Sequence, residues 1–253
     1  VADASIVEAL ESFWHCDEEL QETLDGFSEN TISNFPMPYG IAPNFLIDGD
    51  VYAVPMVIEE SSVVAAAAAA AKYWLIRGGF KTTIIGNTKI GQLHFKFSGS
   101  VDTLRSAFEE IEEYLRLGTA DLTANMVQRG GGVLKIELID FTDQEDDYYQ
   151  IRGHFNTCDS MGANFINSIL EKWGLLLSQF AIESDRIDAK DKDLQIIMAI
   201  LSNYTPECMV RTEVTCPIDE LGSFAGGIDA QLFAKKFSTA VKIAHIDTYR
   251  ATT

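Results

Sequence analysis

The chain has 253 residues, of which 47% are hydrophobic and 23% are charged. That length suits one large domain or two modest ones, and the composition is typical of a globular protein rather than a disordered or fibrous one. Nineteen basic and 38 acidic residues leave a formal net charge of −19. This charge opposes general nucleic-acid binding, since a phosphate backbone needs a basic footprint. A small anionic ligand needs only a local positive patch.

Cysteine and histidine spacing indicates neither a disulfide framework nor a metal centre. The four cysteines and four histidines show no C-x-x-C or H-E-x-x-H spacing, so we expect no metal site and a reducing compartment, the cytoplasm. No apolar run reaches 18 residues, and the segment 63–71 is too short to span a bilayer. The chain does not open with a basic segment followed by an apolar one. We therefore expect a soluble protein without a membrane partner.

The first 60 residues predict surface helices followed by a β-hairpin. Apolar residues recur near helical spacing within 1–27, which predicts one amphipathic helix or a pair. A stretch rich in turn-forming residues follows. The segments 41–46 and 51–58 then have the pattern of strands, and the Asp48-Gly49-Asp50 turn between them predicts a hairpin.

Two carboxylates, Glu59 and Glu60, stand between this hairpin and an alanine-rich helix. The helix opens at Ser61, and Gly78-Gly79 ends it. Acidic residues favour helix N-termini, so simple capping is one interpretation. The other is a general acid or electrostatic residue at the floor of a cleft.

Residues 88–201 predict a series of alternating strands and helices. The order is β-α-β-β-α-β, the ferredoxin-like arrangement, with elements at 90–97, 101–116, 133–141, 148–155, 162–180 and 194–201. An acidic turn at 143–147 is expected to be a solvated hairpin tip. A strand at 208–216 and a helix at 231–245 follow. The fold class is therefore α+β.

The segment Asp159–Asn164 has the pattern of a strand, a tight turn and a helix start. Such a turn directs unpaired backbone N–H groups and the positive end of a helix dipole at an anion. Gly162 and Ala163 would let a phosphate approach the backbone closely. Asp159 could accept hydrogen bonds from a ribose hydroxyl or cap the helix. An ordinary capped helix is the alternative for so short a motif.

Five stretches share their order and spacing with one known family. They are Glu29–Ile32, Val54–Ser62, Asp159–Asn164, Leu201–Asn203 and Asp247–Thr253. Together they resemble hydroxymethylglutaryl-coenzyme A (HMG-CoA) reductase, of the soluble bacterial type called class II. The corresponding segments of that family read E-N-x-I-G, V-P-x-x-x-E-E-P-S, D-A-M-G-A-N, L-S-N and D-P-Y-R-A-x-T.

This resemblance implies a two-domain architecture. The family has a large mixed α/β domain that binds the acyl-coenzyme A, and a small ferredoxin-like domain inserted in it that binds the nicotinamide cofactor. The large domain would here be discontinuous, at 1–87 and 202–253, and the small one would span 88–201. The resemblance also implies a homodimer or a dimer-built hexamer, with the site at the subunit interface.

The resemblance assigns roles residue by residue. Glu60 resembles the catalytic glutamate, which takes part in proton transfer near the thioester carbonyl. The substrate contacts would be Ser62, Arg250 and Thr253. The cofactor contacts would be Asp159, Met161, Gly162, Ala163, Asn164 and Asn203. The implied reaction interconverts HMG-CoA with mevalonate and coenzyme A by two hydride transfers, using NADH or NADPH.

The sequence also departs from the family. Ser61 stands where proline is usual, and Ser33 where glycine is usual. The family continues after the threonine with H-N-K-G, whose lysine is the main electrophile, followed by a catalytic aspartate and a mobile histidine. None of these lies within the 253 residues, so we expect a family fold cut short at its C-terminus. Two other hypotheses are a catalytically incompetent dinucleotide-binding or assembly module, and an acidic α+β domain that binds no dinucleotide.

Overall fold

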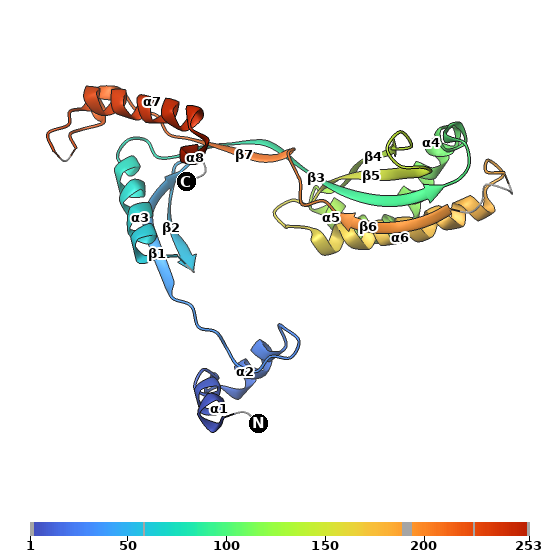
Figure 1. The fold of residues 1–253 in the computed structure, drawn as a ribbon, viewed down its shortest axis with the longest axis horizontal. Coiled ribbons are helices and arrows are strands. Elements are labelled where there is room, and N and C mark those ends of the chain that lie inside the picture. Colours follow the sequence, from blue (N-terminus) through green and yellow to red (C-terminus); the bar gives the residue numbers. More distant parts are fainter. Residues whose placement is uncertain (1–2, 58, 189–193, 225, 252–253) are drawn as a thin grey trace. The chain divides into compact units, whose positions relative to one another are not determined.

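The computed structural model describes residues 3–57, 59–188, 194–224 and 226–251, with side chains as far as residue 249. Contacts divide the chain into two compact units, and each is described by itself. The first unit comprises Val1–Thr82 and Thr212–Thr253, and the second comprises Thr83–Arg211. Figure 1 labels their helices and strands. Within the described ranges, no helix combines the length and apolarity that crossing a bilayer requires.

The first unit contains a helix pair, a β-hairpin and further helices. Its elements are α1 (Ala4–Glu11), α2 (Glu18–Asp25), β1 (Tyr39–Ile47), β2 (Asp50–Val57), α3 (Ser61–Leu75), the 3₁₀ turn η2 (Ile218–Glu220), α7 (Ala230–Ile246) and α8 (Thr248–Ala251). β1 and β2 pair antiparallel, with Ile47 opposite Asp50. The predicted helix pair and hairpin are therefore confirmed.

The alanine-rich helix α3 packs on β1. Gly40 of β1 lies against Val64, and Ala71 is fully buried. Near the end of α3 the Tyr73 hydroxyl donates to the Leu221 carbonyl at 2.8 Å, and the Arg77 guanidinium lies 3.9 Å from the Tyr73 ring centroid. Small side chains on α3 leave room beside α7 for an apolar groove of about 740 Å³, lined by residues that include Ala69, Ala70, Trp74, Phe224, Phe233 and Phe237.

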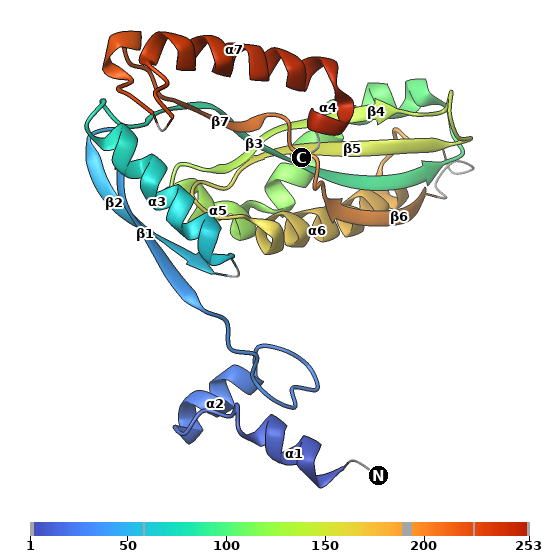
Figure 2. The same cartoon turned by 60° about the vertical axis from the view of Figure 1, so that its left-hand side comes forward.

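The second unit is a sheet with helices packed on one face (Figure 2). Its elements are β3 (Lys81–Phe97), α4 (Val101–Gly118), α5 (Ala120–Gln128), β4 (Gly132–Asp140), β5 (Tyr148–Asn156), α6 (Ala163–Glu183), β6 (Leu194–Leu201) and β7 (Cys208–Glu213), of which β3 and β7 extend into the first unit. The sheet order is β4-β5-β3-β6, and β7 also pairs with β3. β3–β5, β3–β6 and β4–β5 all run antiparallel. The strand and helix order predicted for 88–201 is present.

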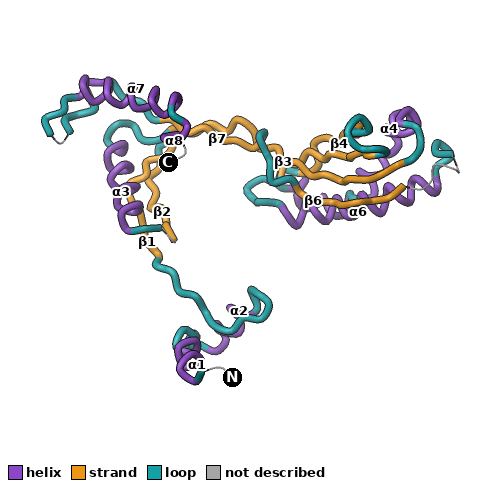
Figure 3. Tube along the Cα trace, viewed as in Figure 1, coloured by secondary structure: helices purple, strands orange, loops and turns teal. Residues whose placement is uncertain are grey.

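Two elements of this unit differ from the sequence-based expectation. β3 begins at Lys81 rather than near residue 90, and its first half pairs with β7 (strands are orange in Figure 3). The side chains of 81–85 are exposed, so this half carries no alternating pattern. The helix α5 was not predicted, since Met126 is its only buried residue. The contact division lies at 82/83 and 211/212, whereas the sequence suggested 87/88 and 201/202.

The core of the second unit lies between the sheet and the helices α4 and α6. Leu93, Phe95 and Phe97 of β3 are fully buried, as are Phe155 and Trp173. The Phe155 and Trp173 rings stack with centroids 5.7 Å apart. Alternate β3 residues thus face α6, which explains the period-2 pattern of that strand.

Leu170→Ala should destabilise the second unit by about 2–5 kcal/mol, because Leu170 is fully buried and its truncation leaves a cavity. Leu175→Ala on the same helix is the control, since Leu175 is 69% exposed. Urea unfolding of both variants, followed by tryptophan fluorescence, measures the difference. Equal losses in the two variants would show that α6 does not pack as described.

Candidate functional site

The turn between β5 and α6 is the part of the second unit that the sequence singled out. Gly162 is the N-cap of α6, with φ at +81°, and no side chain caps the helix. Asp159 is exposed and does not cap it. The interpretation of Asp159 as a helix cap is therefore wrong, because the turn places Gly162 at that position instead.

This turn is held by hydrogen bonds that begin at Thr157. The Thr157 side chain is buried, and its hydroxyl lies 2.7 Å from the Ser160 carbonyl oxygen, to which it donates. The Ser160 N–H and hydroxyl donate to the Thr157 carbonyl at 3.1 and 2.8 Å. A Cβ on Gly162 would lie 2.3 Å from Thr157 Cγ2. Glycine suits this position, because a side chain would be strained at this positive φ and would force Thr157 to shift.

Lys89, which the sequence analysis missed, supports the turn from β3. Its ammonium donates to Thr157 Oγ1 at 2.7 Å, the Ser160 carbonyl at 2.6 Å and the Met161 carbonyl at 3.0 Å. The predicted strand began at Ile90, one residue after Lys89. Lys89 lies on the same face of the strand as the apolar residues Leu93 and Phe95. A lysine in that alternating series is the signal that could have identified it.

Backbone donors gather at the start of α6. Among the described residues, no hydrogen-bond acceptor is found for the N–H groups of residues 161–165. Met161 is 74% exposed, and Asn164 is exposed as well. Free N–H groups at the positive end of a 21-residue helix can bind an anionic group. Gly162 carries no side chain that would keep an anion away from this backbone.

The structure brings Asn203 to the same end of the sheet. Asn203 follows β6 and is exposed. The residue before it, Ser202, donates its N–H to the Ile90 carbonyl at 2.8 Å. The Leu201 N–H donates to Asn167 Oδ1 of α6 at 2.9 Å. The two predicted cofactor segments are thus anchored to neighbouring residues of β3 and to one helix.

The predicted catalytic and substrate residues lie in the first unit. Glu60 is the N-cap of α3 by backbone conformation, but its side chain makes no capping hydrogen bond and is exposed. Capping by the Glu60 side chain is therefore not what the structure shows. Ser62 is exposed in the first turn of α3. Arg250 belongs to α8, with its side chain outside the described residues, as is Thr253.

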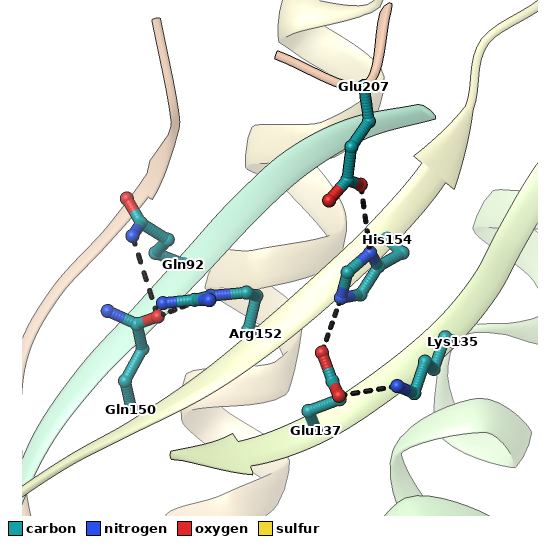
Figure 4. A network of polar contacts seen from close by, with 7 residues as sticks. All are labelled: Gln92, Lys135, Glu137, Gln150, Arg152, His154 and Glu207. Carbon is teal, nitrogen blue, oxygen red and sulfur yellow. Dashed lines mark hydrogen bonds and ion pairs between the residues drawn. The ribbon is translucent and has the colours of Figure 1, made fainter. Parts of the chain in front are cut away.

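A polar network occupies the second unit beside the β5 segment that leads into the turn (Figure 4). His154 lies between two carboxylates, with Nε2 2.6 Å from Glu137 Oε2 and Nδ1 3.8 Å from Glu207 Oε2. Lys135 Nζ lies 2.5 Å from the other Glu137 oxygen. The hydrogen bond from Lys135 is the largest cause that lowers the pKa of Glu137, and burial opposes it. The network ties β4, β5 and the β6–β7 connection together.

Comparison with known proteins identifies the family. A family model described as hydroxymethylglutaryl-coenzyme A reductase matches residues 3–253. The chain therefore belongs to the hydroxymethylglutaryl-coenzyme A reductase family. It is similar to the 3-hydroxy-3-methylglutaryl-coenzyme A reductase of Archaeoglobus fulgidus, with 36% identity over 156 residues, which are 60% of this chain and 35% of the relative. It is also 28% identical over 234 residues to a probable reductase of Borreliella burgdorferi, covering 92% of this chain and 50% of the relative.

Solved structures agree with this assignment. A 3-hydroxy-3-methylglutaryl-coenzyme A reductase from Streptococcus pneumoniae superposes with a TM-score of 0.70 and 28% identity, covering all of this chain and 59% of that one. A class II reductase of the same organism, bound to NADPH in open conformations, superposes with a TM-score of 0.69 and 27% identity, covering all of this chain and 68% of that one. The chain spans half or less of the length of the two curated relatives.

Gly162→Ala should disrupt the turn more than a glycine substitution made in open space. Gly130→Ala is the matched control, because Gly130 also has positive φ, at +88°, but no atom lies within 4 Å of its Cβ position. The control should cost about 1 kcal/mol from backbone strain alone. Gly162→Ala adds the contact with Thr157 and should cost more, as measured by urea unfolding. Equal costs would argue against the described turn.

Acid should weaken the second unit through Glu137. Because the folded-state pKa of Glu137 lies below its ordinary value of 4.5, its contribution is fully present above that value and is lost as the pH falls through the folded-state value. Glu137→Gln should therefore reduce the loss of unfolding free energy between about pH 6 and pH 3. Glu109→Gln, at an exposed position on α4, is the control. An acid sensitivity unchanged by Glu137→Gln would contradict this assignment.

Proposed function

We propose that this chain belongs to an oxidoreductase that interconverts HMG-CoA with mevalonate and coenzyme A by two hydride transfers with NADH or NADPH. The observation that carries the proposal is the family match over residues 3–253. The relatives named above, one of them bound to NADPH, support it. Such an enzyme would act in the cytoplasm, as a homodimer or a dimer-built hexamer.

In this proposal the second unit is the inserted ferredoxin-like domain that binds the dinucleotide. Its sheet order and the turn before α6 support that role. The free N–H groups of the turn would hold the anionic pyrophosphate, and Asp159 would accept a hydrogen bond from a ribose hydroxyl. Met161, Ala163 and Asn164 would line the same site, and Asn203 would lie near the nicotinamide.

The first unit would hold the acyl-coenzyme A. A bound nicotinamide supplies the hydride that reduces the thioester carbonyl. Glu60 would take part in proton transfer at the carbonyl oxygen, which is suited to a carboxyl group that is not engaged in capping. Arg250, Ser62 and Thr253 would hold the free carboxylate and hydroxyl end of the substrate, a task that suits an arginine fork.

The proposal is tested with the full product of the gene. NADPH and NADH oxidation are followed with and without HMG-CoA, and nucleotide binding is measured by calorimetry. Glu60→Gln should lower kcat by about 10²–10⁴-fold, the usual contribution of a general acid–base residue, and leave NADPH affinity unchanged. Glu59→Gln, at the preceding residue, is the matched control.

Three outcomes separate the hypotheses. Substrate-dependent turnover that Glu60→Gln abolishes supports the reductase. Nucleotide binding without turnover favours the module that binds dinucleotide and catalyses nothing. If neither nucleotide binds, the chain has no dinucleotide site, and both the reductase and the dinucleotide-binding module are refuted.

A further inference from the structure

We propose that Lys89 is a positioning residue for the dinucleotide site, because it orients the backbone N–H groups of the turn before α6. The inference rests on the proposed function, which places the cofactor at this turn. Neither the motif 159–164 nor the sequence pattern of β3 assigned Lys89 any role. What distinguishes it is the number and kind of acceptors that its ammonium contacts.

The three donors of the Lys89 ammonium meet three oxygens of one turn. These are Thr157 Oγ1 and the carbonyl oxygens of Ser160 and Met161, at 2.6 to 3.0 Å. A lysine ammonium has three donors and no acceptor, so the contacts use its full capacity. Hydrogen bonds from a charged donor are about twice as strong as neutral ones. The Lys89 ammonium therefore holds three oxygen atoms of the turn at the same time.

Because the peptide group is planar, the hydrogen bonds from Lys89 also fix the direction of the N–H groups on the opposite side of the turn. In a trans peptide the carbonyl of one residue and the N–H of the next point in opposite directions. Since the Ser160 and Met161 carbonyls face Lys89, the N–H groups of Met161 and Gly162 face away from it. Those two N–H groups have no acceptor among the described residues. Lys89 thus orients the two backbone N–H groups to which an anion would bind.

The peptide between Met161 and Gly162 depends most on Lys89. The Ser160 carbonyl also accepts from the Thr157 hydroxyl, so it keeps a partner without the lysine. Among the described residues, the Met161 carbonyl accepts from Lys89 alone. Glycine tolerates a peptide rotation that other residues resist. Without Lys89 this peptide would be free to rotate, and the Gly162 N–H would lose its direction.

Charge adds to this geometric effect. Lys89 takes part in none of the ion pairs found among the described residues. It lies beside the positive end of α6 in a protein whose formal net charge is −19. Lysine and helix dipole together form the local positive patch that a small anion needs here.

The test is a steady-state comparison of Lys89→Met with the unmodified full gene product. Methionine keeps an unbranched side chain but lacks the charge and the donors. We expect KM for NADPH and the calorimetric Kd to rise about tenfold or more, as the loss of charged hydrogen bonds predicts. KM for HMG-CoA should stay unchanged, as should kcat at saturating NADPH. Lys89→Arg should recover part of the affinity.

Lys96→Met is the matched control on the same strand. Lys96 contacts Glu145 and the Asp146 carbonyl at the hairpin tip, and its loss should leave KM for NADPH unchanged. Lys89→Gln, which removes the charge and shortens the side chain but keeps it polar, serves as a second variant if Lys89→Met does not fold. It should also raise KM for NADPH.

The results separate this inference from the proposed function. If the unmodified protein binds NADPH and Lys89→Met binds it equally well, the role of Lys89 is refuted while the proposed function stands. An unchanged KM for NADPH in Lys89→Gln has the same meaning where Lys89→Met is unfolded. An equal rise of the KM values for NADPH and HMG-CoA would show that Lys89 contributes only to the general stability of the protein. If the unmodified protein binds no nucleotide, the proposed function itself fails.

Discussion

The close packing of α6 against β3 is the constraint on which the second unit depends. At Gly91 a Cβ would lie 2.7 Å from Ile166 and 2.8 Å from Leu170, so the helix approaches the strand as closely as the backbone allows. Burial of Trp173 against Phe155 fixes the helix further along. Because interiors are closely packed, neither contact can shift by much without a cavity or a clash. The start of α6 is therefore held at one place beside Lys89 and Gly91, in the middle of β3.

The fixed position of the start of α6 determines the geometry of the candidate site. The β5 strand ends seven residues before α6 begins, and so short a connection must turn tightly. Gly162 makes the turn possible, and Lys89 stabilises it from the strand on which α6 packs. The same end of the sheet holds the segment before Asn203 through the Ile90 carbonyl. One packing interface thus positions both predicted cofactor segments.

Periodicity predicted most of the elements because their burial is regular. Strands with one buried face show alternation, as Leu93, Phe95 and Phe97 do, and the long helices carry apolar stripes. Where burial is slight the pattern fails, which is why the helix α5 and the first half of β3 were missed. The division into a substrate and a cofactor domain stays a prediction, as do the roles of the site residues.

The sequence by itself determined the strand and helix order of the second unit, the hairpin of the first, and the resemblance to the HMG-CoA reductase family. These depend on local patterns and on short motifs such as 159–164. Tertiary structure alone decided that Gly162 rather than Asp159 stands at the cap of α6, that the Glu60 side chain makes no capping hydrogen bond to α3, and that Lys89 reaches the turn. The Lys89 contacts join residues that lie 68 to 72 positions apart in the chain. The two caps depend on backbone angles and side-chain directions, and residue spacing encodes neither these nor the distant contacts.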